Sequence, residues 1–414
     1  MSRRIAPEEL ASVLPRGGRV LVQGATGESG VLAEAVMAAG SDLGALTFTG
    51  AFIPGVNRCT YLANDDCRVE TFFYTPELKS ALADKVTYLP LCYNDIRARL
   101  STIAIDAALF MCSPPDADGR CSFGPAVDFL AELWPRIPVR IAQINPSMPQ
   151  TPGDPGIPFD ELTAFVEQDA PFDAPADTRE DPVANAIAGH IAPFVLDGAC
   201  LQMGVGKVPG AVLRALTGRR NLRVYSGLIV DEVVDLLEAG ALASGASVLA
   251  GVAIGSARLY QAISGPAFEF RPVSVTHSAA AIAAIPNFIS INSALEVDLL
   301  GQVHSELGPK GLMSGPGGAS DYARAARLSP GGLRIIALAA SAAKGSISRI
   351  VPAGQGAGPV SLGRFDVDVV VTEHGAADLR GRDYTARAKS LLSIADPAHR
   401  ADLSESWARY AARL

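Results

Sequence analysis

Short apolar runs alternate along the chain with longer segments whose apolar residues have helical spacing. Residues 19–23 (RVLVQ) predict a buried strand, and a glycine-containing turn at 24–30 (GATGESG) connects it to the helical run VLAEAVMAAG. This order of strand, turn and helix is typical of open parallel sheets whose faces are covered by helices. Runs of the same kind predict further strands at 45–49, 107–112 and 139–144.

The same order begins again in the second half of the chain. A predicted strand at 198–203 leads into a second glycine-rich turn, GVGKVPG at 204–210. Between the halves, residues 167–182 (EQDAPFDAPADTREDP) are acidic, rich in proline and without periodicity, which is typical of a linker. We therefore predict two α/β domains, 1–180 and 181–414. Later runs predict strands at 224–226, 333–339 and 367–372 and a helix at 231–238.

Composition and charge exclude several classes of protein. The chain has 414 residues, of which 49% are hydrophobic and 19% are charged, and its formal net charge is −8. This length allows two or three domains with full-sized cores. The chain has no basic block, so we expect no nucleic-acid partner. Its longest uncharged stretches are interrupted by polar residues, so we expect no membrane-spanning helix.

The cysteines, the histidines and the N-terminus bear on location and on metals. The six cysteines form no CxxC pair, and the N-terminal MSRRIAPEEL lacks the apolar core of a signal peptide. Reduced thiols in a cytoplasmic protein are the simplest interpretation. The five histidines are scattered, without HxxxH or HExxH spacing, so we expect no metal site.

Two glycine-rich turns are candidates for ligand binding. The turn GVGKVPG (204–210) follows a predicted strand and opens a helix, so its backbone N–H groups can point at an anion or a polarised carbonyl. It has neither the GxGxxG order of dinucleotide sites nor the GK[ST] of a P-loop. The loop SGPGGASDYARAA (314–326) also precedes a helical run, with Asp321 in the first turn. A plain structural turn is the alternative for both.

Charged residues within apolar sequence are the second group of candidates. Lys344 follows a predicted strand, where a cation can reach a phosphate or a thioester-linked chain, although solvation is the alternative. The pair Glu373–His374 lies at the carboxyl end of another strand, where open α/β sheets bind ligands, and a loop cap is its alternative. Glu296 and Asp298 share one face of a predicted strand, where carboxylates are costly unless they are paired or functional.

These motifs also form a recognisable series. In the C-terminal half they run in the order LQMGVGKVPGAVL, SGLIVDEVVDLLEAG, INSALEVDLLGQV, SGPGGASDYARAA, KGSISRIVP and VVTEHGAADLRG, and the N-terminal half contains CSPPDADGRCSFG and INPSMPQTPGD. The series resembles the acetyl-CoA hydrolase/transferase family, which includes the 4-hydroxybutyrate and succinyl-CoA:acetate CoA-transferases. The resemblance implies two tandem CoA-transferase-type open α/β domains with the active site in the cleft between them. It also implies an acyl-CoA substrate, no cofactor other than the coenzyme A of that substrate, and a homodimer.

The resemblance further implies roles for individual residues. In this family a glutamate attacks the acyl-CoA thioester, and the groups then pass through a mixed anhydride and a glutamyl-CoA thioester. Such a nucleophile divides one hard exchange into two easier steps, and an oxyanion hole of backbone N–H groups stabilises the developing charge. By motif position, Val205 and Gly206 lie on one side of this hole, Gly317 and Gly318 lie on the other, Lys344 approaches the pantetheine and phosphates, and Glu373 lies beside the reacting centre.

The chain departs from the family pattern at the nucleophile. The stretch 224–232 (VYSGLIVDE) matches the family's strand without gaps, anchored by the VVDLLEAG that follows. Gly227 then stands at the position of the glutamate, and Glu232 stands where the family has a glycine. Because a glycine cannot form the anhydride, the family's usual mechanism is not open to this chain.

Three hypotheses follow from this departure. In the first, the enzyme uses water, with Glu232 or Glu373 as general base, for thioester hydrolysis or for hydrolytic carbon–carbon cleavage of a β-keto acyl-CoA. In the second, Glu232 is a substitute nucleophile and CoA transfer survives. In the third, the chain is inactive and only binds a CoA ester. Small residues at Gly227 and Ala319 also predict a pocket roomier than an acetyl group needs.

Overall fold

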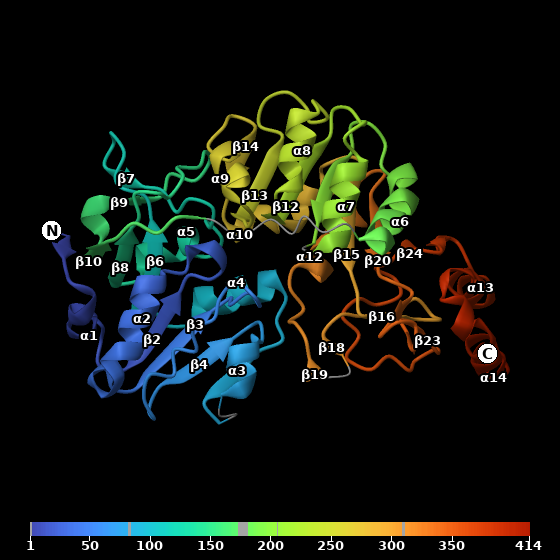
Figure 1. The fold of residues 1–414 in the computed structure, drawn as a ribbon, viewed down its shortest axis with the longest axis horizontal. Coiled ribbons are helices and arrows are strands. Elements are labelled where there is room, and N and C mark those ends of the chain that lie inside the picture. The colour runs from blue at the N-terminus through green and yellow to red at the C-terminus, as the bar shows by residue number, and fades with distance from the viewer. Residues whose placement is uncertain (1, 82–83, 173–180, 205, 309–310) are drawn as a thin grey trace. The chain divides into compact units, whose positions relative to one another are not determined.

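The protein forms two compact units (Figure 1). The computed structural model describes residues 2–81, 84–172, 181–204, 206–308 and 311–414. The first unit consists of Met1–Ala176 and Val248–Thr276, and the second of Asp177–Ser247 and His277–Leu414.

The division of the chain into domains was predicted to fall at residue 180. Of the predicted linker at 167–182, residues 173–180 lie outside the described part of the chain, and Glu167 still belongs to a strand. The division into domains 1–180 and 181–414 stays a prediction.

A parallel sheet forms the centre of the first unit. All of its strand pairings are parallel. The turn predicted at 24–30 connects a central strand to a helix whose N-cap, Ser29, accepts the backbone N–H of Leu32. The strands run in the order β1 (Arg3–Arg4), β10 (Ala164–Glu167), β8 (Val139–Ile144), β6 (Ala107–Cys112), β2 (Gly18–Val22), β3 (Leu46–Gly50), β4 (Arg68–Thr71) and β5 (Val86–Tyr88).

Buried aromatic and aliphatic side chains form the core of this unit. Phe48, Phe52 and Tyr61 are each almost fully buried, and the ring of Tyr61 stacks against both phenylalanines. The remaining elements are η1 (Pro7–Glu9), α1 (Leu10–Val13), η2 (Ala25–Gly27), α2 (Gly30–Ala39), η3 (Gly40–Leu43), α3 (Pro76–Ser80), α4 (Tyr93–Thr102), β7 (Arg120–Cys121), α5 (Leu130–Leu133), η4 (Trp134–Arg136), β9 (Ile157–Pro158), η5 (Phe159–Glu161), β13 (Val248–Ala253), α9 (Ala257–Ala262), β14 (Phe268–Phe270) and α10 (Val273–Thr276).

The second unit contains another mainly parallel sheet. Its last strand, β25, pairs antiparallel with β24, whereas the pairings β12–β11, β11–β15, β15–β20 and β20–β24 are parallel. The strands run in the order β12 (Arg223–Ile229), β11 (Cys200–Met203), β15 (Phe288–Ser293), β20 (Leu333–Ala337), β24 (Val369–Thr372) and β25 (Gly375–Asp378). The predicted α/β fold with parallel sheets is confirmed, as are the strands predicted in both halves of the chain.

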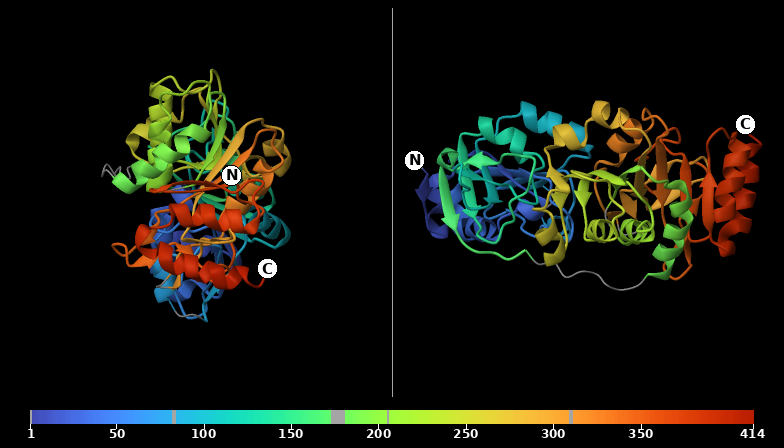
Figure 2. Two further views of the ribbon diagram at one scale, coloured as in Figure 1. Left: turned by 90° about the vertical axis from the view of Figure 1, so that its right-hand side faces the viewer. Right: turned by 90° about the horizontal axis from the view of Figure 1, so that it is seen from above.

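Helices and small sheets complete the second unit. The two C-terminal helices pack on each other, and α13 also packs on β25 (Figure 2). These elements are α6 (Pro182–Ile191), η6 (Ala192–Phe194), α7 (Lys207–Ala215), α8 (Glu232–Glu238), α11 (Ala279–Ala283), β16 (Glu296–Asp298), β17 (Val303–His304), β18 (Leu307–Gly308), β19 (Gly311–Leu312), α12 (Ala319–Ala326), β21 (Ser341–Ala342), β22 (Ile347–Ser348), β23 (Ile350–Val351), α13 (Tyr384–Ile394), η7 (Pro397–His399) and α14 (Arg400–Ala411).

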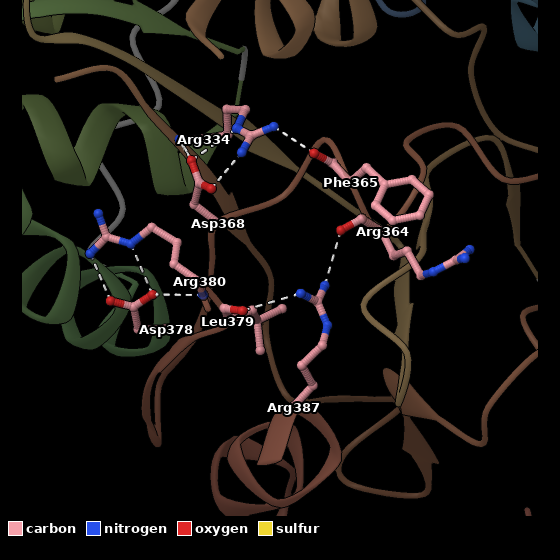
Figure 3. Close-up of polar contacts among 8 residues, drawn as sticks. All are labelled: Arg334, Arg364, Phe365, Asp368, Asp378, Leu379, Arg380 and Arg387. Carbon is pink, nitrogen blue, oxygen red and sulfur yellow. Dashed lines mark hydrogen bonds and ion pairs between the residues drawn. The ribbon is translucent and has the colours of Figure 1, made fainter. Parts of the chain in front are cut away.

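Arginines on a strand and on a helix of this unit bind its loops (Figure 3). Arg334 of β20 makes a bidentate ion pair with Asp368, and both side chains are mostly buried. Arg387 of α13 donates to the backbone carbonyls of Leu300, Leu379 and Arg364, at 3.0 to 3.2 Å. Charged donors on main-chain carbonyls fix these loops against α13.

Candidate active site

Three residues lie in one row at the carboxyl edge of the second unit's sheet. Cys200 of β11 pairs with Arg223 of β12, and continuing this register places Gly204 level with Gly227. The register of β11 with β15 places Gly204 level with Asn292 in the same way. A Cβ built on Gly204 would lie 3.4 Å from the side-chain oxygen of Asn292, which agrees with this placement. The carboxyl edge is where open α/β sheets bind their ligands.

A buried polar network lies directly beneath this row. Gln202 Oε1 accepts from the hydroxyl of Ser290 at 2.7 Å and from the amide of Asn292 at 3.0 Å. The same amide of Asn292 also donates to the Ser290 hydroxyl at 3.0 Å, and all three side chains are buried. A satisfied network of this kind fixes the ends of two strands in one arrangement. The sequence analysis missed it, although polar residues inside the apolar runs LQMG and ISINS are a detectable sign.

The turn after β11 carries the predicted oxyanion residues. Gly206 is the N-cap of α7, and its φ of 119° lies in a region that favours glycine. Lys207, the first residue of α7, lies 3.4 Å from the carboxylate of Asp181. Val205 lies outside the described residues, so its predicted contribution to an oxyanion hole stays a prediction.

His277 fills the space beside Gly227. A Cβ built on Gly227 would lie 2.6 Å from Cε1 and 3.0 Å from Nε2 of His277, and 3.2 Å from the hydroxyl of Tyr322. The His277 and Tyr322 rings have centroids 4.7 Å apart, and both side chains are almost fully buried. The expectation of a roomier pocket beside Gly227 is therefore wrong at this position, because an imidazole and a phenol occupy the space.

The imidazole of His277 is held in its neutral form. Burial alone lowers the pKa of His277 to about 3, because a charged imidazolium would lose its hydration there. The sequence analysis did not select this residue, since a single histidine in the run SVTHS carries no spacing signal.

The second glycine-rich loop reaches the same imidazole. Gly318 is the N-cap of α12, and a Cβ built on it would lie 2.6 Å from Nε2 of His277. Gly317, with a φ of 61°, precedes it. The structure thus brings together Gly227 and Gly318, two residues that the sequence analysis placed at one site, through a third residue that it did not name.

Glu232 has a partner of its own. It is the first residue of α8, and its carboxylate forms an ion pair of 2.6 Å with Arg214 of α7. A Cβ on Gly210 would collide with the same carboxylate, so Glu232 lies tightly between the two helices. This pairing occupies the group that was predicted to act as a base or a substitute nucleophile.

Glu373 lies elsewhere on the sheet edge, and Lys344 lies in the turn of a separate two-stranded sheet. Glu373 follows β24, which β11, β15 and β20 separate from β12, and its carboxylate accepts the backbone N–H of Ala340 at 2.8 Å. Lys344 is exposed in the turn between β21 and β22, with a φ of 58°. A ring nitrogen of His399 lies 2.8 Å from the Gly345 carbonyl and fixes this turn.

The carboxylates of β16 have structural partners. Asp298 is fully buried and accepts the backbone N–H groups of Leu300, Gln302 and Gly354. Glu296 accepts the backbone N–H of Ala357. The sequence left two explanations for these carboxylates, a structural partner or a function. Their hydrogen bonds show that both have structural partners.

The described residues contain neither a cluster of metal-ligand side chains nor a helix that could span a membrane. Among these residues, no three histidine, cysteine, aspartate or glutamate side chains gather as metal ligands would. None of the helices found there has the length and apolar character needed to cross a membrane.

Residues 2–174 match the model of the acetyl-CoA hydrolase/transferase N-terminal domain, and residues 255–407 match that of the C-terminal domain. The chain is 34% identical over 328 residues to the 4-hydroxybutyrate coenzyme A transferase of Clostridium kluyveri, covering 77% of this chain and 76% of the relative. It is 36% identical over 309 residues to the succinyl-CoA:cyclohexane-1-carboxylate CoA transferase of Geobacter metallireducens, covering 73% and 71%. An acetyl-CoA hydrolase of Saccharomyces cerevisiae is 29% identical over 280 residues, covering 60% and 50%.

Solved structures resemble the whole chain. The crystal structure of RipA from Yersinia pestis superposes with a TM-score of 0.90 at 28% identity, covering 99% of this chain and 97% of the other. A 4-hydroxybutyrate CoA-transferase from Porphyromonas gingivalis superposes with a TM-score of 0.82 at 29% identity, covering 99% and 98%.

Proposed function

The chain belongs to the acetyl-CoA hydrolase/transferase family, and from this premise we propose that it is an acyl-CoA hydrolase that uses water where its transferase relatives use a carboxylate. The observation that carries the proposal is the packing at Gly227. This residue stands at the family's nucleophile position by resemblance, and the imidazole of His277 lies where a side chain would begin. An attacking group that is not attached to the chain avoids this conflict.

The proposed reaction balances without a further reactant. The oxygen of water attacks the thioester carbonyl carbon, the carbon–sulfur bond breaks, and its electron pair leaves with the CoA sulfur. A base takes the proton of the attacking water and returns it to the thiolate, so the products are a carboxylic acid and free CoA. Backbone N–H groups of the turns at Val205–Gly206 and Gly317–Gly318 would stabilise the oxyanion. Attack on the keto carbon of a β-keto acyl-CoA would instead break a carbon–carbon bond.

Of the two candidate bases we favour Glu373. Glu232 is already paired with Arg214, whereas one oxygen of Glu373 is held by the Ala340 amide at the ligand-binding edge. Since β24 and β12 are not neighbours, this role requires the acyl-CoA to extend along the edge between them. The exposed Lys344 is proposed to meet the phosphates of CoA from the same side.

CoA transfer is the second candidate function. It is favoured by the named relatives, which are mainly CoA transferases. In this mechanism Glu232 would leave Arg214 and act as a substitute nucleophile. A catalytically inactive CoA-ester-binding protein is the third, and it predicts binding without turnover.

Free-thiol release tests the three functions. Short, branched, aromatic and β-keto acyl-CoAs are incubated with the protein in water enriched in oxygen-18, with and without acetate. A hydrolase releases CoA without acetate and places the label in the product carboxylate. A transferase needs acetate, and its product is acetyl-CoA. Formation of acetyl-CoA that depends strictly on acetate, without release of free thiol, would overturn the proposal.

Location and assembly remain proposals. The resemblance and the reduced thiols support a cytoplasmic homodimer, and none of the six cysteines, all of which the structure describes, forms a disulfide. Sedimentation of the purified protein tests the dimer.

A further inference from the structure

We propose that His277 determines the reaction class of this site, because its imidazole takes the volume that any side chain at position 227 needs. The inference rests on the proposed function and deepens it. According to this inference, the ring of His277 requires a glycine at position 227. The absence of the glutamate then follows from this packing and is not an isolated substitution.

The geometry places one ring edge against two glycines from different elements. Cε1 and Nε2 of His277 lie 2.6 and 3.0 Å from the Cβ position of Gly227, on β12. Nε2 and Cδ2 lie 2.6 and 3.0 Å from the Cβ position of Gly318, at the start of α12. Real Cβ atoms do not approach other heavy atoms to 2.6 Å, so neither position accepts even an alanine while the ring stays in place.

Neither side of this contact can move easily. Gly227 lies in β12, whose neighbour Ser226 donates its hydroxyl to the carbonyl of Met203 on β11 at 3.1 Å. The ring of His277 packs on Tyr322, and the ring of Tyr322 stacks in turn on the buried Phe288 at 6.4 Å. Packed interiors of this kind yield to added atoms only at a cost in stability.

The imidazole also changes the chemistry of the position. Where the resemblance places an ionised carboxylate, this chain presents the edge of an uncharged ring, because burial keeps His277 neutral. A neutral imidazole edge at this point cannot form an anhydride with the acyl group. An acceptor that comes from solution, such as water, agrees with the absence of a carboxylate at this position.

A consequence is that one substitution should not restore the family's nucleophile. In Gly227→Glu the new side chain meets His277, whereas in Gly227→Glu combined with His277→Ala it has the volume of the missing ring. In the double variant the new carboxylate can attack acyl-CoA and release CoA thiolate. The thiolate can then attack the anhydride, release the acyl carboxylate and leave CoA bound to Glu as a thioester.

Two measurements test this inference. The first is a thermal-shift cycle that needs no substrate: Gly227→Ala is made in the wild type and in His277→Ala. We expect a fall in melting temperature of several degrees in the wild type and less than about a third of that fall when the ring is absent. Gly204→Ala, at the equivalent place on β11 and with only an ordinary contact of 3.4 Å, is the matched control and should shift little in either background. Equal falls for Gly227→Ala in both backgrounds would overturn the inference.

The second measurement is intact-protein mass spectrometry after incubation with acetyl-, butyryl-, 4-hydroxybutyryl- and succinyl-CoA. We expect a hydroxylamine-sensitive CoA adduct in the double variant and none in Gly227→Glu alone. An adduct of equal yield in Gly227→Glu alone would overturn the inference.

If His277→Ala does not fold, His277→Asn lacks the outer ring atoms and serves as the second background. Coupling in the thermal cycle supports the inference even if the wild type releases no thiol, so the two proposals fail separately.

Discussion

Asp298 offers the sharpest test of whether a buried carboxylate here is structural or catalytic. Asp298 is fully buried in β16, which follows β15 of the candidate site in the sequence. Its two carboxylate oxygens accept hydrogen bonds from four donor groups. Oδ1 accepts the backbone N–H groups of Leu300 and Gln302, both at 2.9 Å. Oδ2 accepts the side-chain amide of Gln302 and the backbone N–H of Gly354, also at 2.9 Å. The test is Asp298→Asn, which keeps the shape and removes one acceptor.

The cost can be worked from these contacts. An asparagine keeps most bonds when its oxygen faces the N–H groups of Leu300 and Gln302, because the Gln302 amide can then turn its own oxygen to the new NH₂. The N–H of Gly354 is left facing a donor, and a buried unsatisfied donor costs about 1–3 kcal/mol. The two remaining bonds also lose their ionised acceptor, which makes hydrogen bonds stronger. We therefore expect a loss of about 2–4 kcal/mol in the free energy of unfolding.

Urea unfolding followed by tryptophan fluorescence measures this loss of stability in the second unit of the protein, which contains Asp298. The chain has two tryptophans, and Trp407 packs in the same core as Val297 and Leu299, which flank Asp298. In a Trp134→Phe background, Trp407 therefore reports on this core alone, and a shift of the midpoint at constant slope gives the change.

Glu296→Gln, two residues away, is the matched control for Asp298→Asn. A glutamine can still offer an oxygen to its one amide partner, Ala357, so the change should stay below about 1 kcal/mol. An unchanged midpoint for Asp298→Asn, together with a fall in thiol release of 100-fold or more, would refute the structural interpretation.

Three further predictions concern other parts of the chain. Glu373→Gln should lower thiol release at least about 100-fold and Glu232→Gln less than about threefold, because Glu232 is already ion-paired; equal losses would contradict the choice of base. Arg334→Met leaves Asp368 buried without its cation, so the urea midpoint should fall by the equivalent of about 3–5 kcal/mol, and a change below about 1 kcal/mol would count against the pair. Burial raises the pKa of Asp128 to about 7, so its contribution to stability is complete below its unfolded pKa of about 4 and is lost as the pH rises through 7. Urea midpoints of the wild type should therefore fall relative to Asp128→Asn between about pH 4 and 7, and parallel curves would refute this.

The local pattern of apolar and turn residues was enough to predict most strands of the two large sheets. The run RVLVQ became β2, and the short run at 224–226 fell inside β12, because both are apolar segments next to turn residues. The strand that carries Glu296 and Asp298 was also found, with both side chains on one face as alternation requires. Their partners could not be found in this way, since the amides of Gly354 and Ala357 come from a distant loop.

The candidate site also contains contacts that local sequence pattern could not predict. Gly227 and Gly318 were selected by motif, but the residue that joins them, His277, lies far from both in sequence and has no pattern around it. Glu232 was selected because it lies near Gly227 in the family pattern, and at the start of α8 the structure pairs its carboxylate with Arg214. The sequence pattern did not indicate this ion pair, because it depends on how α7 and α8 pack.

The register across β12, β11 and β15 places Gly227 and Gly204 side by side, so the two glycines belong to one structural feature. It places Gly227, Gly204 and Asn292 in one row, and the Gln202–Ser290–Asn292 network fixes that row from below. His277 lies against Gly227 at one end of this row. On the proposed function, an acyl-CoA bound along this edge would meet the neutral ring beside β12 and the carboxylate of Glu373 after β24. On the proposed function, this edge would still bind the ligand while the position for an attacking side chain is lost, which is why loss of the ring together with gain of a carboxylate should be needed to restore transfer.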